Sequence, residues 1–167
     1  WMRHLGVAAL VAVTLQGVLG GITVLYFLPT PISVSHAGLA QVFFSLTIGL
    51  ALFTSAGWRR SGALDTHEPV IRDSTLVTLA TGLPALVYVQ ILVGATMRHT
   101  GAGLAIPDFP LAFGRLVPPQ WSFAIAVHFL HRIGAVATAL LILATARHLL
   151  VHHSERRDLI RPAWALV

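Results

Sequence analysis

Ionisable side chains are few inside the long apolar stretches of the sequence. The candidates for chemistry among them are His36, His128, His131 and Arg132. An ionisable group in such a stretch is costly and tends to face the interior of a helix bundle or a cavity. Histidine in that setting acts as a ligand to a metal or haem iron, or as a proton relay. The alternative is a ring that only hydrogen-bonds a neighbouring carbonyl group.

The spacing of His128 and His131 places them on neighbouring faces of one helix. The axial ligands of one haem iron approach from opposite sides, so these two histidines do not serve the same iron. One is a ligand candidate and the other is local support, and the residues alone leave open which is which. Arg132 could pair with a haem propionate through its planar fork, or reach lipid headgroups. The other histidines are read as solvated or weaker: His4, His67, His99, His148, His152 and His153.

The sequence lacks the residues that several other kinds of site require. The chain has no cysteine, and no carboxylate lies within an apolar stretch. These features disfavour a Cys/His zinc cluster and a proton-driven transporter. All eleven basic residues are arginine, and the formal net charge of +5 needs no nucleic-acid partner to explain it.

The elements that must position these histidines are membrane-spanning helices. Hydrophobic residues make up 56% of the chain, charged residues only 10%, and the mean hydropathy is +0.79. About 20 apolar residues are needed to cross the roughly 30 Å hydrocarbon layer. Four stretches qualify: 5–28, 33–57, 75–97 and 122–149. Short joints make antiparallel hairpins, so we predict an all-α membrane protein whose four transmembrane helices form two antiparallel hairpins.

The polar segments divide the chain further. We predict a first transmembrane hairpin over 1–57 and a cytoplasmic loop over 58–74. A second hairpin covers 75–150 and carries an outward loop over 98–121. Residues 151–167 are predicted to form a cytoplasmic segment and the start of a further helix. Pro84, inside the third span, predicts a kink.

The arginines predict how the chain is oriented in the membrane. One side holds Arg3, Arg59, Arg60, Arg72, Arg147, Arg156, Arg157 and Arg161, and the other holds Arg98, Arg115 and Arg132. The richer side is expected in the cytoplasm. Both ends of the sequence are then cytoplasmic, and the 98–121 loop faces out.

An internal repeat relates the two hairpins. Gln16–Gly21 in the first span matches Gln90–Ala95 in the third, and histidines follow at the outer end of the next helix in each case. Two hairpins of the same orientation predict a pseudo-twofold axis along the membrane normal. Small residues are expected to let the helices approach closely: Gly17, Gly21, Gly94, Gly134 and Ala135.

The sequence resembles the haem A synthase family over nearly its whole length. The loop segment reads Arg98-His-Thr-Gly-Ala-Gly-Leu-Ala-Ile-Pro-Asp-Phe-Pro-Leu-Ala-Phe-Gly114, followed by Pro118-Pro119 and by His128-Phe-Leu-His131-Arg132. Gln16-Gly-Val-Leu-Gly-Gly21 and His36-Ala-Gly-Leu-Ala-Gln41 are also similar to the family.

The resemblance implies eight membrane helices in two similar halves, each with a histidine pair. Such an enzyme oxidises a methyl group of haem O to the formyl group of haem A for cytochrome oxidase. The four spans here look like the third to sixth helices. His36 then looks like an axial ligand to the iron of substrate haem O. His131, beside Arg132, looks like an axial ligand to the iron of a haem b cofactor, with the outward loop as a lid whose Gly101 and Gly103 give close backbone approach.

The sequence also departs from the family. Two helices of the family pattern are absent from this sequence: the one with Glu-x-x-His-Arg and the one with the fourth histidine. The catalytic residue is therefore unknown. Ile106 and Ala112 stand where many bacterial members have cysteines. The chain is therefore expected to be an internal part of such an enzyme and to be inactive when isolated. The alternative is a half-sized enzyme, in which His36 and His131 face one haem or two chains together complete the site.

The resemblance also implies a location and partners. We expect a multi-pass protein of the bacterial plasma membrane, in contact with the lipid bilayer and with haem O. Haem O synthase and cytochrome oxidase assembly factors are further candidate partners, and the electron donor is unknown. Two other functions are alternatives. One is a non-catalytic haem b protein that carries electrons in the membrane, and the other is a structural or assembly membrane protein.

Overall fold

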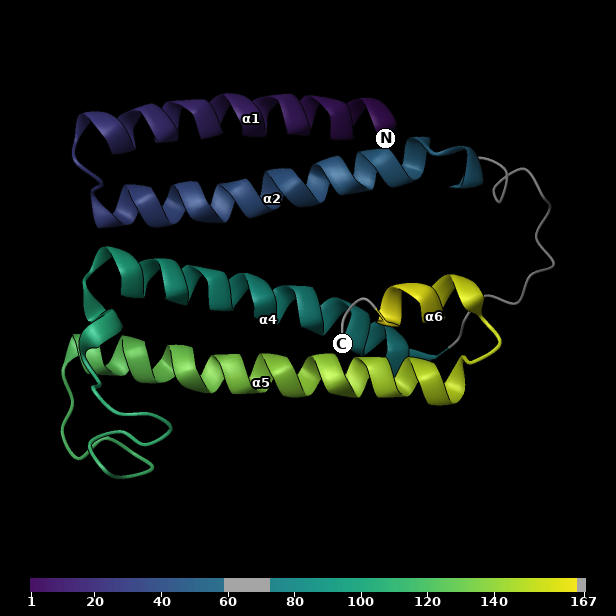
Figure 1. Ribbon diagram of the computed structural model, residues 1–167. Coiled ribbons are helices and arrows are strands. Elements are labelled where there is room, and N and C mark those ends of the chain that lie inside the picture. The colour runs from purple at the N-terminus through teal and green to yellow at the C-terminus, as the bar shows by residue number, and fades with distance from the viewer. Residues whose placement is uncertain (59–72, 165–167) are drawn as a thin grey trace. The chain divides into compact units, whose positions relative to one another are not determined.

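The computed structural model describes residues 1–58 and 73–164, and these residues are almost entirely helical (Figure 1). Within them there is no β-strand, only an isolated bridge between Ala112 and Arg115. The chain divides into two compact units, Trp1–Ile71 and Arg72–Val167. The prediction of an all-α protein is confirmed. The predicted loop over 58–74 lies almost wholly outside the described residues.

The first unit is a hairpin of α1, Met2–Leu25, and α2, Thr30–Thr54. Both helices were predicted to lie about three residues later in the chain. Pro31 was expected in the connection between them, but it belongs to the first turn of α2. Proline fits there because the N–H it lacks has no helical partner at that position.

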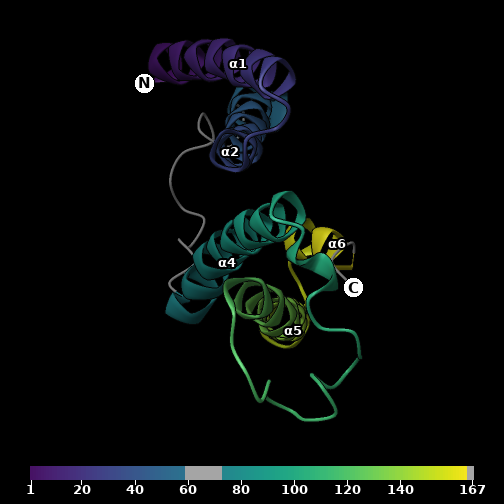
Figure 2. The ribbon, with the colours of Figure 1, turned by 90° about the vertical axis from the view of Figure 1, so that its left-hand side faces the viewer.

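The second unit contains α4, Ser74–His99, and α5, Phe123–His152, which pack side by side and antiparallel (Figures 1 and 2). Asp73 caps the start of α4 by accepting a hydrogen bond from the backbone N–H of Leu76 at 2.9 Å. Helix α4 continues through Pro84 without a break. A short 3₁₀ helix, η1 (Ala102–Leu104), follows α4, and α6 (Arg157–Trp164) follows α5.

The four long helices are suited to cross a membrane. Each has 24 to 30 residues and at most two charged residues in its most apolar window. At 1.5 Å per residue, 24 residues rise about 36 Å, which exceeds the roughly 30 Å hydrocarbon layer. Few of their side chains are buried within the protein, so most of this apolar surface is available to lipid. The chain is a multi-pass membrane protein.

The loop between α4 and α5 is organised by one carboxylate. Phe113 and Gly114 form a two-residue turn with φ of 56° and 74°, a pair of positive values that a type I′ turn requires. Their backbone N–H groups donate to Asp108 Oδ1 and Oδ2, both at 2.7 Å. The hydrogen bond from Gly114, together with that from Phe113, lowers the pKa of the Asp108 carboxyl group below its usual range.

The close backbone approach of Gly101 and Gly103 to a haem stays a prediction. Within the described part of the chain, a Cβ atom added at either residue would meet no atom within 4 Å. Gly101 has a role in the fold, because its φ of +69° lies in the left-handed region that often follows the last residues of a helix. It lets the chain leave α4 and enter η1.

We predict that Asp108→Asn loosens this loop. Asparagine lacks the second acceptor oxygen, so one of the two N–H groups at the turn loses its partner. Trypsin should then cleave after Arg115 several-fold faster in the full chain held in detergent micelles. Gln120→Ala, an exposed change in the same loop, is the matched control and should leave the cleavage rate unchanged; equal rates in all three proteins would contradict the role of Asp108.

The same carboxylate predicts a pH dependence. Because its pKa is lowered by folding, the stabilisation is fully present above the ordinary carboxyl pKa of about 4 and is lost as pH falls through the lowered value. The hydrogen-exchange protection factors of the Phe113 and Gly114 amides should therefore be constant near neutral pH and fall in acid. In Asp108→Asn the protection of one of the two amides should be low at every pH, because asparagine keeps a single acceptor oxygen.

Candidate functional site

In the first unit, His36 lies against the opposite helix at Gln16 and Gly20. The Gln16 amide nitrogen is 3.3 Å from His36 Nε2. A Cβ atom at Gly20 would come within 3.2 Å of His36 Cε1, so a larger residue there would require the ring to shift by a few tenths of an ångström. Gln16 Oε1 and His36 Nδ1 are buried without a hydrogen-bond partner among the described residues. Such orphaned atoms are uncommon in folded proteins and mark a place where a further group can bind.

In the second unit, His131 occupies the same kind of position. The Gln90 amide nitrogen donates to the backbone carbonyl of His131 at 2.7 Å and lies 3.1 Å from its Nδ1. A Cβ atom at Gly94 would come within 2.9 Å of His131 Cε1. Gly134 gives room in turn to the Gln90 side chain, which a Cβ atom there would meet.

The repeat predicted from the sequence therefore has a physical basis within each unit. Gln16 and Gly20 stand to His36 as Gln90 and Gly94 stand to His131. The expectation of close approach holds at Gly94 and Gly134. It is wrong at Gly17 and Gly21, where a Cβ atom would meet nothing within 4 Å in the described residues; the glycine in contact is Gly20, which was not on the predicted list.

His128 does something else. It is only 8% exposed, and its two ring nitrogens face protein donors. Arg132 Nε lies 3.1 Å from Nε2, and the backbone N–H of Ile106 lies 3.3 Å from Nδ1. A neutral imidazole accepts at only one nitrogen, so no more than one of these contacts is a full hydrogen bond. Both edges of the ring are nevertheless covered by the protein.

Arg132 joins α5 to the loop over 98–121. Its guanidinium donates to the carbonyl of Leu111 at 2.9 Å and to that of Ile106 at 3.2 Å. It also lies over the ring of Phe109, 5.7 Å from the centroid, a distance at which a cation and an aromatic face attract. Together, His128 and Arg132 hold the loop against the first turns of α5.

A pocket of about 900 Å³ lies between this loop and α5. That volume is at the upper end of the range for small-molecule and cofactor sites, roughly 300–1,000 Å³. Its walls are mostly apolar, with Phe109, Leu116, Val136 and Leu140 among the lining residues. His131 and Arg132 also line it. The pocket therefore combines an apolar surface, one imidazole and one fixed cation.

The three residues predicted for cofactor binding are thus distributed over two units. His131 and Arg132 line one pocket in the second unit, whereas His36 belongs to the first unit. Helix periodicity could not separate the roles of His128 and His131, because the difference arises from the loop that folds back over His128 and from the glutamine opposite His131.

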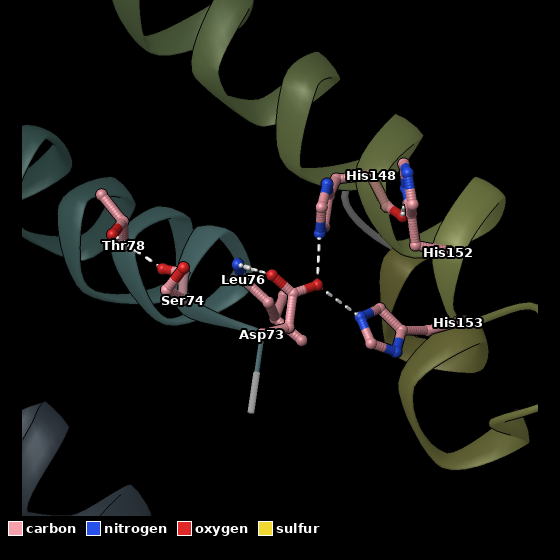
Figure 3. Close-up of polar contacts among 7 residues, drawn as sticks. All are labelled: Asp73, Ser74, Leu76, Thr78, His148, His152 and His153. Atoms are coloured by element: carbon pink, nitrogen blue, oxygen red, sulfur yellow. Dashed lines mark hydrogen bonds and ion pairs between the residues drawn. The ribbon is translucent and has the colours of Figure 1, made fainter. Parts of the chain in front are cut away.

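Three side chains at the other end of the second unit were not recognised in the sequence. His148 and His153 were read as solvated, and this is wrong: both side chains are 15% exposed, and each places Nε2 against Asp73 Oδ2, at 2.7 and 2.9 Å (Figure 3). The backbone N–H of Leu76 and these imidazoles lower the pKa of Asp73 below its usual range. Only the antiparallel pairing of α4 with α5 could have indicated this cluster.

Comparison with known proteins identifies the family. The model of the cytochrome oxidase assembly protein family matches residues 1–167. A heme A synthase of Symbiobacterium thermophilum is 33% identical over 99% of this chain and 54% of its own length. Those of Shouchella clausii and Geobacillus kaustophilus are 30% and 28% identical over 84% and 98% of this chain, and 46% and 50% of their own lengths.

The chain thus spans about half the length of the curated relatives it matches. Their similarity runs through both units, including the helices that carry Gln16, His36, Gln90 and His131. The chain belongs to the cytochrome oxidase assembly protein family, to which the heme A synthases also belong.

Proposed function

We propose that this chain forms part of a haem A synthase, which oxidises a methyl group of haem O to the formyl group of haem A for cytochrome oxidase. The family and the relatives named heme A synthase support this proposal. The observation that carries it is the pocket that brings His131 and Arg132 together within apolar walls. A porphyrin needs these features: an axial nitrogen, a cation for a propionate, and apolar surface for the ring.

His131 is proposed to bind the iron of a haem b cofactor through Nε2. Its Nδ1 faces the Gln90 amide, so Nε2 is the nitrogen left for a ligand. A ring that ligates through Nε2 carries its hydrogen on Nδ1 and needs an acceptor there. The carbonyl oxygen of Gln90 can supply that acceptor once the side chain moves and gives up its hydrogen bond to the His131 carbonyl, so haem binding would rearrange Gln90.

His36 is proposed to bind the iron of substrate haem O. The orphaned Nδ1 of His36 and Oε1 of Gln16 support a binding role for this second constellation. The bound haem b supplies the oxidising chemistry that no side chain can supply. The protein contributes ligation, orientation and exclusion of water from the pocket.

Arg132 is proposed to orient the cofactor. A guanidinium has five N–H donors, and three of its bonds go to His128, Ile106 and Leu111. The remaining donors are available to a propionate at the pocket wall. Because Arg132 also holds the loop, the same side chain would contact both the cofactor and the loop that covers it.

We further propose that the protein lies in the bacterial plasma membrane with α1 starting, and α5 ending, on the cytoplasmic side. The excess of arginine near those helix ends supports this orientation. The loop over 98–121 is then outside. Haem O synthase is a proposed partner because it makes the substrate. Cytochrome oxidase assembly factors are also proposed partners, because they would receive the product.

We predict that His131→Ala removes one of two haem-binding steps. The full chain in micelles is titrated with haem b in the presence of free imidazole, which supplies a second axial ligand. Absorption spectra should show two low-spin binding steps in the original chain. His131→Ala should weaken one of them by roughly tenfold or more, the factor that loss of about 1.4 kcal/mol gives.

Two further variants sharpen this titration. His36→Ala should remove the other step, and His152→Ala, which deletes an exposed histidine at the far end of α5, should change neither. Unchanged haem affinity in His131→Ala, or an equal loss of affinity in His152→Ala, would contradict ligation by His131.

The enzymatic proposal is tested in cells. The gene containing this chain is expressed in a bacterium that makes haem O but not haem A, and the haems are extracted and separated. We expect haem A to appear, and His131→Ala to abolish it while the protein level is maintained. Haem b bound to the protein without any haem A would instead identify an electron carrier.

The proposed orientation can be tested directly because the chain has no cysteine of its own. Val117→Cys in the outward loop should react with a membrane-impermeant maleimide on intact spheroplasts. Glu155→Cys, exposed after the end of α5, should react only after the membrane is opened. The reverse pattern would invert the orientation.

A further inference from the structure

A cluster of three side chains joins the start of α4 to the end of α5 (Figure 3). Asp73 is the N-cap of α4, His148 lies in the last turns of α5, and His153 is its C-cap. Their ligand atoms, a carboxylate oxygen and two imidazole nitrogens, all lie within 4.8 Å of one another. We infer that Asp73, His148 and His153 form a binding site for a zinc-like divalent metal ion.

The donor set favours zinc over the common hard cations. Zn²⁺ binds imidazole nitrogen and carboxylate oxygen at about 2.0–2.2 Å, commonly with three protein ligands and a water. Ca²⁺ takes six to eight oxygen ligands and Mg²⁺ requires near-ideal octahedral oxygen coordination, which one carboxylate and two histidines do not offer. Tetrahedral bonds of that length separate the ligand atoms by about 3.3 Å. The contacts of 2.7 and 2.9 Å to Asp73 Oδ2 therefore need only small movements to admit the ion.

The surroundings hold two of the three ligands in orientation. Asp73 Oδ1 accepts a hydrogen bond from the N–H of Leu76 at 2.9 Å, which leaves Oδ2 directed at the two imidazoles. The ring of His152 stacks on that of His148 with centroids 4.5 Å apart, and its Nδ1 lies 3.2 Å from the His148 carbonyl. Groups that fix a ligand's orientation in this way typically raise metal affinity.

The site is separate from the pocket at His131. His148 lies seventeen residues after His131 in α5, which corresponds to about 26 Å along the helix axis. A metal there could not take part in chemistry at a haem bound by His131. It would hold the start of α4 against the end of α5. It would also restrain the segment that leads to α6, because the N–H of Arg156 in that segment donates to the carbonyl of His153.

Without a metal ion, Asp73, His148 and His153 form a hydrogen-bonded cluster, called the clasp here, in which both imidazoles donate to one carboxylate oxygen. The two states differ in what they require. The clasp tolerates glutamine in place of histidine, because the glutamine amide also donates a hydrogen bond, whereas zinc coordination does not. The clasp also tolerates asparagine at position 73, which remains a good N-cap residue but is a poor metal ligand.

The test uses the full chain, purified with a tag free of histidine, treated with a chelator and titrated with Zn²⁺. We expect one saturable equivalent by calorimetry and a zinc-dependent rise in Tm, with no such rise in Mg²⁺. Asp73→Asn, His148→Gln and His153→Gln should each weaken zinc binding by at least about tenfold. His4→Gln, which changes an exposed histidine of the first unit, is the matched control and should keep zinc affinity within about twofold.

Cobalt provides a second readout that does not depend on stability. Co²⁺ in place of Zn²⁺ should give the intense visible absorption of a tetrahedral site, which His153→Gln should lose while its circular dichroism stays helical. Absence of a saturable zinc equivalent in the original chain would overturn the inference. So would zinc binding that is equally strong in Asp73→Asn and His153→Gln, because the metal would then be held elsewhere.

Discussion

The structure depends on one constraint: inside a bilayer there is no water to satisfy a polar side chain, so its partner must come from the protein. Each hairpin uses the same residue types for this, although Gln16 Oε1 and His36 Nδ1 have no partner among the described residues. A glutamine on one helix faces a histidine on the next, and a glycine one turn along gives the ring its space. This arrangement fixes where the two helices meet and how close they come. The histidine is therefore held in place before any ligand binds.

The helix ends follow a related rule with different groups. At the loop end of the second hairpin, Arg132 and His128 tie the loop to α5, while Asp108 orders the turn inside that loop. At the other end, Asp73 draws two histidines of α5 to the start of α4. Polar contacts thus occupy the ends of this hairpin, and its long middle relies on close apolar packing around small residues. The proposed haem pocket lies beside the contacts at the loop end, and the proposed metal site lies within those at the other end.

Sequence reasoning predicted the features that composition controls and missed those that tertiary pairing controls. The four spans, the hairpins and the glutamine–glycine–histidine repeat followed from apolar length and order along the chain. The start of α2 was misplaced because Pro31 was taken to end the connection rather than to begin a helix. His148 and His153 were taken as solvated because Asp73, their partner, is 75 and 80 residues away in the sequence. No local pattern reports such a contact.

The repeat also bears on how a complete haem site would be built. Each hairpin places one histidine beside its glutamine, and the axial ligands of a haem iron must approach from opposite faces. His128 cannot serve as the second ligand in its hairpin, because it shares a helix with His131 and its ring is enclosed by Arg132 and Ile106. In the proposed haem b site, the second axial ligand would therefore come from outside the hairpin that supplies His131. The pocket fits this arrangement, because its described lining comes from the loop and α5: the hairpin would prepare one face of the site, and another element would complete it.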